Sequence, residues 1–151
     1  TPNSINAVGK IGMDDQGNYL IGWRFHDKTT GQDDAYARRY IPDTPPVTTL
    51  LNGQSVSNLS GAAYSWRYFK ITVPTGYPRL DISMNGPAGS GDADLYVRYG
   101  ALPTLTAWDG RPYVGGNNEA VYITNPRAGD WYIGLYGYSS YLSVGLRAYY
   151  Y

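Results

Sequence analysis

Few side chains in this sequence are suited to catalysis. His26 is the only histidine among 151 residues, so a Ser-His-Asp triad would have to use it. The chain contains no Gly-x-Ser-x-Gly turn, no His-Glu-x-x-His helix and no phosphate-binding loop. Asp92 and Asp94 could serve a glycosidase as a carboxylate pair, but their position in a glycine-rich turn favours turn formation or metal binding. We therefore predict that His26 is a surface or loop residue and that the protein is not an enzyme.

The same two carboxylates are candidates for binding calcium. The segment Ser90-Gly91-Asp92-Ala93-Asp94 places them two residues apart, and Asn117-Asn118-Glu119 offers further oxygens. Calcium takes about six to eight oxygen ligands, including backbone carbonyls, and loops of this kind can supply them. The alternative is that both carboxylates accept hydrogen bonds from the turn's own amides or pair with Arg98 or Arg111. No other cofactor is predicted.

The composition is unusual in its aromatic residues. Tyrosine occurs 17 times and phenylalanine twice, alongside four tryptophans. Because tyrosine hydroxyls need hydrogen-bond partners, tyrosine favours half-exposed positions. Exposed rings beside hydrogen-bonding groups suit stacking on sugar rings or on fibrous protein. The alternative is structural: the rings cover an outer sheet or a contact with another domain.

Two surfaces are candidates for such binding. The first is a rim of loops at the end of the fold, which comprises Trp108, Asp109, Arg111, Tyr113, Tyr138 and Tyr141. The second is the outward face of the last two strands, where alternation places Tyr132, Tyr136, Arg147 and Tyr149. A hairpin through residues 137–141 would make the members of this second set neighbours on one face. We predict the rim as the ligand-binding site, because loops commonly carry function and Trp108 lies beside hydrogen-bonding groups.

The charge balance and the absence of cysteine exclude several kinds of binding partner and site. Lysine plus arginine and aspartate plus glutamate each number 12, so the formal net charge is zero. Proteins that bind nucleic acid or anionic membranes carry a basic excess, so we predict neither partner. No apolar run approaches the ~20 residues that a membrane helix needs. Cysteine is absent, which excludes disulfides, thiol catalysis and thiolate metal sites.

The elements that must position these residues are strands. Short runs of Tyr, Val, Ile and Thr recur between clusters of Gly, Pro, Asn and Asp, and no segment repeats apolar residues at helical spacing. Apolar and polar residues alternate over residues 66–73, 79–84, 94–99, 119–124, 131–136 and 142–151. Such alternation predicts sheets with one buried face and one wetted face. The expected fold is all-β: a two-sheet antiparallel β-sandwich, jelly-roll-like, with an N-terminal β-meander.

A proline-rich segment divides the chain. Pro42-Asp43-Thr44-Pro45-Pro46 cannot continue a strand ladder and is typical of a stiff linker. Before it, runs at residues 7–13, 19–25 and 35–41 predict a three-stranded meander. The first loop of this meander, residues 14–18, has hairpin chemistry and is a weaker calcium candidate. We therefore predict a meander segment with its linker at residues 1–44 and a sandwich domain at residues 45–151.

Five motifs follow one another through the sandwich segment. They are Ser65-Trp66-Arg67-Tyr68-Phe69-Lys70-Ile71-Thr72-Val73-Pro74, Gly91-Asp92-Ala93-Asp94-Leu95-Tyr96-Val97-Arg98-Tyr99-Gly100, Asp109-Gly110-Arg111-Pro112-Tyr113, Gly116-Asn117-Asn118-Glu119 and Ala128-Gly129-Asp130-Trp131-Tyr132-Ile133. In this order they resemble the bacterial pre-peptidase C-terminal domain over residues 47–151. The resemblance implies a secreted β-sandwich module, usually at the C-terminus of metalloproteases, subtilisin-like proteases and some polysaccharide-degrading enzymes. It also implies a role in binding insoluble substrate, or in secretion or maturation followed by cleavage.

One departure from the family pattern concerns a disulfide. Many members carry cysteines where this chain has Gly110 and Val121, and the resemblance implies that those cysteines pair across the loop. Both cysteines are absent from this chain, as expected if the disulfide was lost as a whole and not by the loss of one partner. Such a bridge contributes roughly 3 kcal/mol to stability. We expect packing by Trp108, Tyr113 and Tyr122 to replace it.

The N-terminal segment resembles a β-repeat of large secreted bacterial proteins. The resemblance is carried by Asp14 followed by Gly17-Asn18-Tyr19-Leu20-Ile21-Gly22-Trp23, and by Tyr36-Ala37-Arg38-Arg39-Tyr40. It suggests that the chain is a piece of a longer secreted protein.

Two functions from different classes follow from these features. The first is a non-catalytic accessory module of a secreted, extracellular bacterial hydrolase, either a protease or a polysaccharide-degrading enzyme. Its predicted partners are the catalytic domain of that enzyme and an insoluble polymer, with polysaccharide slightly preferred over fibrous protein. The second is a C-terminal maturation or secretion domain of a secreted peptidase that is cleaved off. Retention on insoluble polymer distinguishes them, because a maturation domain stays in the supernatant.

Overall fold

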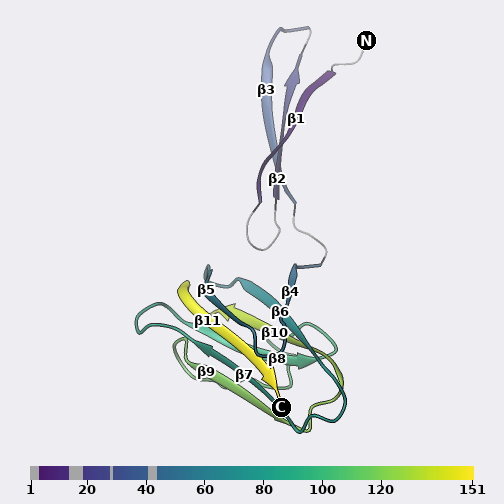
Figure 1. The fold of residues 1–151 in the computed structure, drawn as a ribbon. Helices are drawn as coiled ribbons and strands as arrows, with labels where there is room; N and C mark the ends of the chain where they lie inside the picture. The colour runs from purple at the N-terminus through teal and green to yellow at the C-terminus, as the bar shows by residue number, and fades with distance from the viewer. Residues whose placement is uncertain (1–3, 14–18, 28, 41–43) are drawn as a thin grey trace. The chain divides into compact units, whose positions relative to one another are not determined.

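The computed structural model describes residues 4–13, 19–27, 29–40 and 44–151, and all regular structure in them is β-strand. The chain divides into two units, Thr1–Pro46 and Val47–Tyr151 (Figure 1). Across the described ranges, no helix has the length and apolar character needed to cross a membrane.

The N-terminal unit is a three-stranded antiparallel meander, as the three runs of strand-forming residues predicted. Its strands are β1 (Ser4–Met13), β2 (Tyr19–His26) and β3 (Asp33–Tyr40), and they pair in the order β1-β2-β3. Register shifts interrupt the pairing of β1 with β2 at two places. Every residue of β3 is exposed, although the rings of Trp23 and Tyr36 stack across the β2–β3 pair with centroids 6.0 Å apart.

The C-terminal unit is a sandwich of two four-stranded sheets (Figure 1). Its strands are β4 (Val47–Thr49), β5 (Ser55–Gly61), β6 (Trp66–Val73), β7 (Arg79–Asn85), β8 (Ala93–Tyr99), β9 (Glu119–Thr124), β10 (Gly129–Gly137) and β11 (Tyr141–Tyr150). The first sheet has the order β4-β6-β10-β8 and the second has the order β5-β11-β7-β9. All pairs are antiparallel except β4 with β6, which is parallel. Consecutive strands therefore belong to opposite sheets throughout this unit.

The core between the two sheets is built from the predicted inward residues. Phe69, Ile71 and Val73 of β6 face it, as do Leu80, Ile82 and Met84 of β7. The inward set of β10, Trp131, Ile133 and Leu135, is also buried. Burial of apolar area on this scale is the main favourable contribution to folding. The period-two alternation thus identified the core correctly for these strands.

The outer face of the first sheet differs from the prediction of a wetted face. Tyr68 and Tyr96 point outward from β6 and β8, yet both are buried. The ring of Trp66 packs against them, with centroids 5.3 Å from Tyr68 and 5.0 Å from Tyr96. The loop after β8 covers this cluster through Pro103, whose carbonyl accepts a hydrogen bond from the Tyr68 hydroxyl at 3.4 Å. Part of the tyrosine excess therefore forms a second, aromatic core.

The last strand also departs from strict alternation. Tyr141, predicted at the rim, is only 3% exposed and packs in the core, whereas Leu142, predicted inward, is 58% exposed. The cause is a bulge: the pairing of β11 with β5 shifts register between Tyr141 and Val144, and Ser143 has a φ of +58°. An extra residue of this kind moves the preceding side chains to the opposite face. From Val144 to Ala148 the prediction holds.

The loop after β8 approaches β9 at the two positions where the family resemblance implies a disulfide. Gly110 lies against Val121, because a Cβ atom added to this glycine would fall 2.5 Å from Cγ1 of the valine. Gly110 also bridges to Val97 of β8. Trp108, Tyr113 and Tyr122, which we expect to replace the bridge by packing, are exposed but make ring contacts: Trp108 with Tyr113, and the other two with arginines. Their contribution to stability stays a prediction.

Candidate functional site

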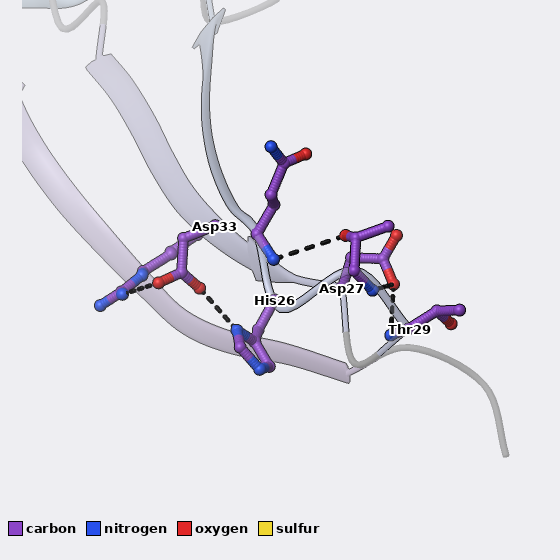
Figure 2. A network of polar contacts seen from close by, with 7 residues as sticks. His26, Asp27, Thr29 and Asp33 are labelled. Atoms are coloured by element: carbon purple, nitrogen blue, oxygen red, sulfur yellow. Dashed lines mark hydrogen bonds and ion pairs between the residues drawn. The ribbon is translucent and has the colours of Figure 1, made fainter.

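His26 ends β2 and pairs with a carboxylate on β3. Its Nδ1 lies 2.7 Å from Oδ1 of Asp33, whose other carboxylate oxygen forms an ion pair with Arg24 (Figure 2). The hydrogen bond from Arg24, followed by that from His26, lowers the pKa of the Asp33 carboxyl. In the next turn, Asp27 accepts a hydrogen bond from the Thr29 amide at 2.7 Å. His26 and Arg24 thus share the Asp33 carboxylate in an exposed ion-pair network.

The two carboxylates proposed for calcium both bind groups of the protein. Oδ1 of Asp92 accepts a hydrogen bond from the Gly116 amide at 2.9 Å, and Oδ2 of Asp94 pairs with Arg111 at 2.8 Å. The guanidinium so close to Asp94 opposes a second cation there. Within the described ranges, no group of three or more His, Cys, Asp or Glu side chains is arranged to hold a metal ion. The weaker candidate, residues 14–18, lies outside the described residues.

Asn117 and Glu119, the other candidate calcium ligands, accept hydrogen bonds from backbone amides of β8. Asn117 lies in the loop before β9, and Glu119 is the first residue of β9. Oδ1 of Asn117 accepts a hydrogen bond from the Ala93 amide at 2.9 Å. The Glu119 carboxylate accepts from the Leu95 amide at 2.5 Å and from the Val114 amide at 3.2 Å. Burial raises the pKa of Glu119 to about 7. These side chains therefore act as buried anchors that position the loop.

Arg111 is the centre of the predicted rim site. Its guanidinium lies 4.7 Å from the centroid of Tyr96 and 3.7 Å from the centroid of Tyr113, so it contacts two tyrosine rings. The same group forms the ion pair with Asp94. Its Nε is buried and has no hydrogen-bond partner among the described residues. Lysine could not replace arginine here without loss, because only the planar guanidinium can both stack on tyrosine rings and donate two parallel hydrogen bonds to a carboxylate.

The exposed rings of Trp108 and Tyr113 form the solvent-facing part of the rim. Trp108 is 37% exposed and Tyr113 is 65% exposed, and their centroids are 6.0 Å apart in an edge-to-face arrangement. Tyr113 has a φ of +60°, a left-handed conformation that is unusual for a bulky residue. Oδ2 of Asp109 accepts a hydrogen bond from the Tyr99 amide at 2.7 Å, so this carboxylate fixes the turn. The structure thus brings Trp108, Arg111 and Tyr113 together.

The other two predicted rim residues are separated from each other. Tyr138 is exposed in the turn between β10 and β11, whereas Tyr141 is buried in the core. The turn that carries Tyr138 meets the loop that carries Tyr113 at Asp92. The backbone carbonyl of Asp92 accepts from the Ser139 amide, and its carboxylate accepts from Gly116. Tyr138 therefore stays a candidate, and Tyr141 does not.

The alternative ligand face does not exist as one surface. Tyr132 and Tyr136 lie on β10 in the first sheet, while Arg147 and Tyr149 lie on β11 in the second. The prediction was wrong because it joined β10 and β11 in a hairpin. The connection through residues 137–141 instead carries the chain from one sheet to the other. Tyr136 packs on Trp66 at 4.9 Å, as part of the outer aromatic core.

The outer face of the second sheet carries its own aromatic group. Tyr149 and Tyr151 stack with centroids 5.4 Å apart, and both hydroxyls lie 3.3 Å from Oδ2 of Asp81. The guanidinium of Arg147 lies 4.8 Å from the Tyr149 ring, and Nε of Arg79 donates to Oδ1 of Asp81 at 2.6 Å. Sequence reasoning missed Asp81 as the organiser of this group. Alternation placed it outward on β7, but the strand order was needed to set it beside Tyr149.

Comparisons with known proteins identify a family for the sandwich unit and several similar proteins. The model of the family described as "Bacterial pre-peptidase C-terminal domain" matches residues 67–137. Alkaline serine exoprotease A of Vibrio alginolyticus is 43% identical over 109 residues, which are 72% of this chain and 20% of the exoprotease. Extracellular protease of Xanthomonas campestris pv. campestris is 46% identical over 102 residues, which are 68% of this chain and 17% of that protease. The chain therefore spans a fifth or less of these two relatives.

A solved structure is also similar to this chain in sequence and in fold. The structure described as "Solution structure of vEP C-ter 100" is 38% identical to this chain and superposes with a TM-score of 0.55. The match covers 66% of this chain and 95% of that one. Nearly the whole of that solved chain is therefore similar to about two thirds of this one.

Proposed function

The chain belongs to the bacterial pre-peptidase C-terminal domain family through its sandwich unit, and from this premise we propose that it is a non-catalytic accessory module of a secreted bacterial hydrolase. The two relatives are both proteases, one of them named as extracellular, which favours a protease over a polysaccharide-degrading enzyme as the parent. In this proposal the module associates with a catalytic domain and holds it against an insoluble polymer.

The observation that supports polymer binding is the pair of exposed rings of Trp108 and Tyr113 at the rim. Trp108 and Tyr113 present large rings to solvent, yet Tyr113 is fixed from below by Arg111 and the buried Asp94. A tyrosine in a left-handed conformation raises the energy of the fold, and such strain concentrates at functional sites. Fixed rings lose little conformational entropy on binding, which favours affinity. We infer that Trp108 and Tyr113 are stacking residues for the polymer.

The experiment is retention of the 151-residue chain on insoluble chitin, cellulose, agar and collagen. Trp108→Ala removes an exposed anchor, and loss of such an anchor costs about 2 kcal/mol or more of binding free energy. We expect retention of this variant to weaken by at least about tenfold with an unchanged circular dichroism spectrum. Leu105→Ala is the matched control, because Leu105 is an exposed side chain on the same loop without a ring. Equal loss in both variants would contradict a role for the indole.

The rival proposal is a maturation or secretion domain that is cleaved off. It is supported by the same relatives, since the matched segment is a small part of each protease. It predicts that the wild-type chain stays in the supernatant with all four polymers. The rim residues would then matter for stability or for contact with the catalytic domain.

A further inference from the structure

A polar groove lies on the outer face of the second sheet, on elements other than the loop that carries Trp108 and Tyr113. It is lined from β5, β11, β7 and the turn after β7. Six of its side chains are neutral hydrogen-bonding groups: Ser55, Ser57, Asn58, Ser83, Asn85 and Ser143. All six are exposed, and none hydrogen-bonds to another residue in the part of the chain that the structure describes. Their donors and acceptors are therefore available to a ligand.

The backbone at this groove is irregular in two adjacent strands. Asn58 has a φ of +56° and Ser143 has a φ of +58°, and both residues line the groove. They flank the pair Leu59–Val144, where the register of β5 with β11 shifts on either side. Glycine adopts such a conformation without strain, asparagine tolerates it, and serine adopts it at a cost in energy. The chain thus keeps two polar side chains at positions where glycine would also fit the backbone.

Beyond the groove, the same face continues into aromatic rings. Arg147 lines one end, and its guanidinium lies over the ring of Tyr149, which is the next residue on that face of β11. Tyr149 stacks with Tyr151 and both hydroxyls reach Asp81. A chain that left the groove along β11 would meet these rings.

The chemistry of this surface favours a hydroxyl-rich neutral chain. Serine hydroxyls and asparagine amides each donate and accept, which matches the paired donor and acceptor character of sugar hydroxyls. A single arginine and no lysine line the groove, so a polyanion has little to bind. Of the strands that line the groove, β11 and β7 are paired on both sides, so a peptide could extend the sheet only at the edge strand β5 and not across the groove.

We propose that this groove binds a segment of a neutral polysaccharide, with Asn58 and Ser143 as hydrogen-bonding residues and Tyr149 as the adjacent ring. The inference rests on the proposed polymer-binding function and adds to it a second contact surface and the class of polymer. The left-handed backbone of both residues gives the proposal a distinctive signature. Their replacement by glycine removes the side chains and relieves the strain at once.

The test compares the double variant Asn58→Gly/Ser143→Gly with wild type on insoluble chitin, cellulose and agar. We expect its melting temperature to be unchanged or higher and its affinity for the retaining polysaccharide to fall by about tenfold, as two lost hydrogen bonds would give. Asn125→Gly is the matched control, because Asn125 has a φ of +49° and is exposed outside the groove. This control should gain stability in the same way and keep full binding.

Three results would overturn the proposal in distinguishable ways. If the double variant binds polysaccharide like wild type while Trp108→Ala does not, the groove is not a contact surface and the proposed function stands. If wild type binds collagen alone and the double variant loses that binding, the occupant is a protein. If wild type binds none of the polymers, the proposed function itself fails.

Discussion

At the scale of single residues, the conformation of the rim loop depends on the ion pairs and hydrogen bonds that its polar side chains form within the protein. Arg111 is paired with Asp94 and lies against two tyrosine rings, so its guanidinium already has partners within the protein. Asp109, Asn117 and Glu119 likewise bind backbone amides of neighbouring segments. Their residue types suggested ligand or metal binding, but in this fold they shape the loop that presents Trp108 and Tyr113.

Glu119 should make stability depend on pH. Its pKa is raised by burial to about 7, above its ordinary value of 4.5, so the folded state holds the proton more tightly than the unfolded state. Its stabilising contribution is therefore complete below pH about 4.5 and is lost as pH rises through about 7. At about 1.4 kcal/mol for each pH unit, the free energy of unfolding should fall by about 3 kcal/mol across this window.

The measurement is chemical unfolding at several pH values for wild type and Glu119→Gln. The neutral amide cannot titrate, so the fall between pH about 4.5 and 7 should disappear in the variant, whatever its overall stability. Asp130 acts in the opposite sense and at lower pH, because its hydrogen bond from Lys70 lowers the pKa of the carboxyl. An identical pH slope in both proteins would assign the titration to another group.

Calcium binding at Asp92 and Asp94 stays a prediction. Each carboxylate has one oxygen without a partner among the described residues, Oδ2 of Asp92 and Oδ1 of Asp94. If calcium binds the folded state, a hundredfold excess over its Kd raises stability by about 2.7 kcal/mol. The melting temperature should then rise with calcium, and Asp94→Ala should abolish the rise. A melting temperature indifferent to calcium and to chelator would rule the site out.

At the scale of elements, the sequence predicted individual strands better than their partners. Alternation in residues 66–73 and 131–136 identified the buried faces, because a sheet buries every second side chain. The same pattern carries no information about which strands pair. The tight segment at residues 137–141 suggested a hairpin, but β10 and β11 lie in different sheets. The short strands β4 and β5 were not predicted, since β4 has three residues and β5 carries a bulge.

Bulges and covering loops account for the remaining errors in the candidate site. Ser143 gives no sign in the sequence that it adopts a left-handed conformation, yet this one residue exchanges the environments of Tyr141 and Leu142. The burial of Tyr96 depends on the long loop after β8, whose path cannot be predicted from periodicity. The groove at Asn58 was missed for the same reason: its side chains come from three separated segments.

The contact of Gly110 with Val121 predicts that a disulfide can be restored there. The Cβ atom that Gly110 lacks would lie 3.6 Å from Cβ of Val121, within the range of disulfide-bonded cysteines. Gly110→Cys/Val121→Cys should therefore form an intramolecular bridge that raises the free energy of unfolding by about 3 kcal/mol. Unfolding with and without reducing agent measures the gain, and Gly110→Ser/Val121→Ser is the control. A free thiol count of two under oxidising conditions would contradict the geometry.

At the scale of the whole molecule, the two units differ in how they achieve stability. The sandwich buries a continuous core between its sheets, whereas every residue of β3 in the meander is exposed. A sandwich of this family is a small part of the proteases that contain it. Its exposed rim rings and its polar groove lie on separate elements, so they can be altered independently. This separation makes the binding proposal open to a direct test.

The most direct measurement is the depletion isotherm of the wild-type chain on insoluble chitin, cellulose, agar and collagen. A binding module should be removed from solution in a saturable way by at least one of these polymers, and Trp108→Ala should shift that isotherm by at least about tenfold. Retention should survive moderate salt, because the chain has zero formal net charge and the proposed contacts are neutral. A wild-type chain that stays in the supernatant with all four polymers would contradict the account and favour the maturation domain.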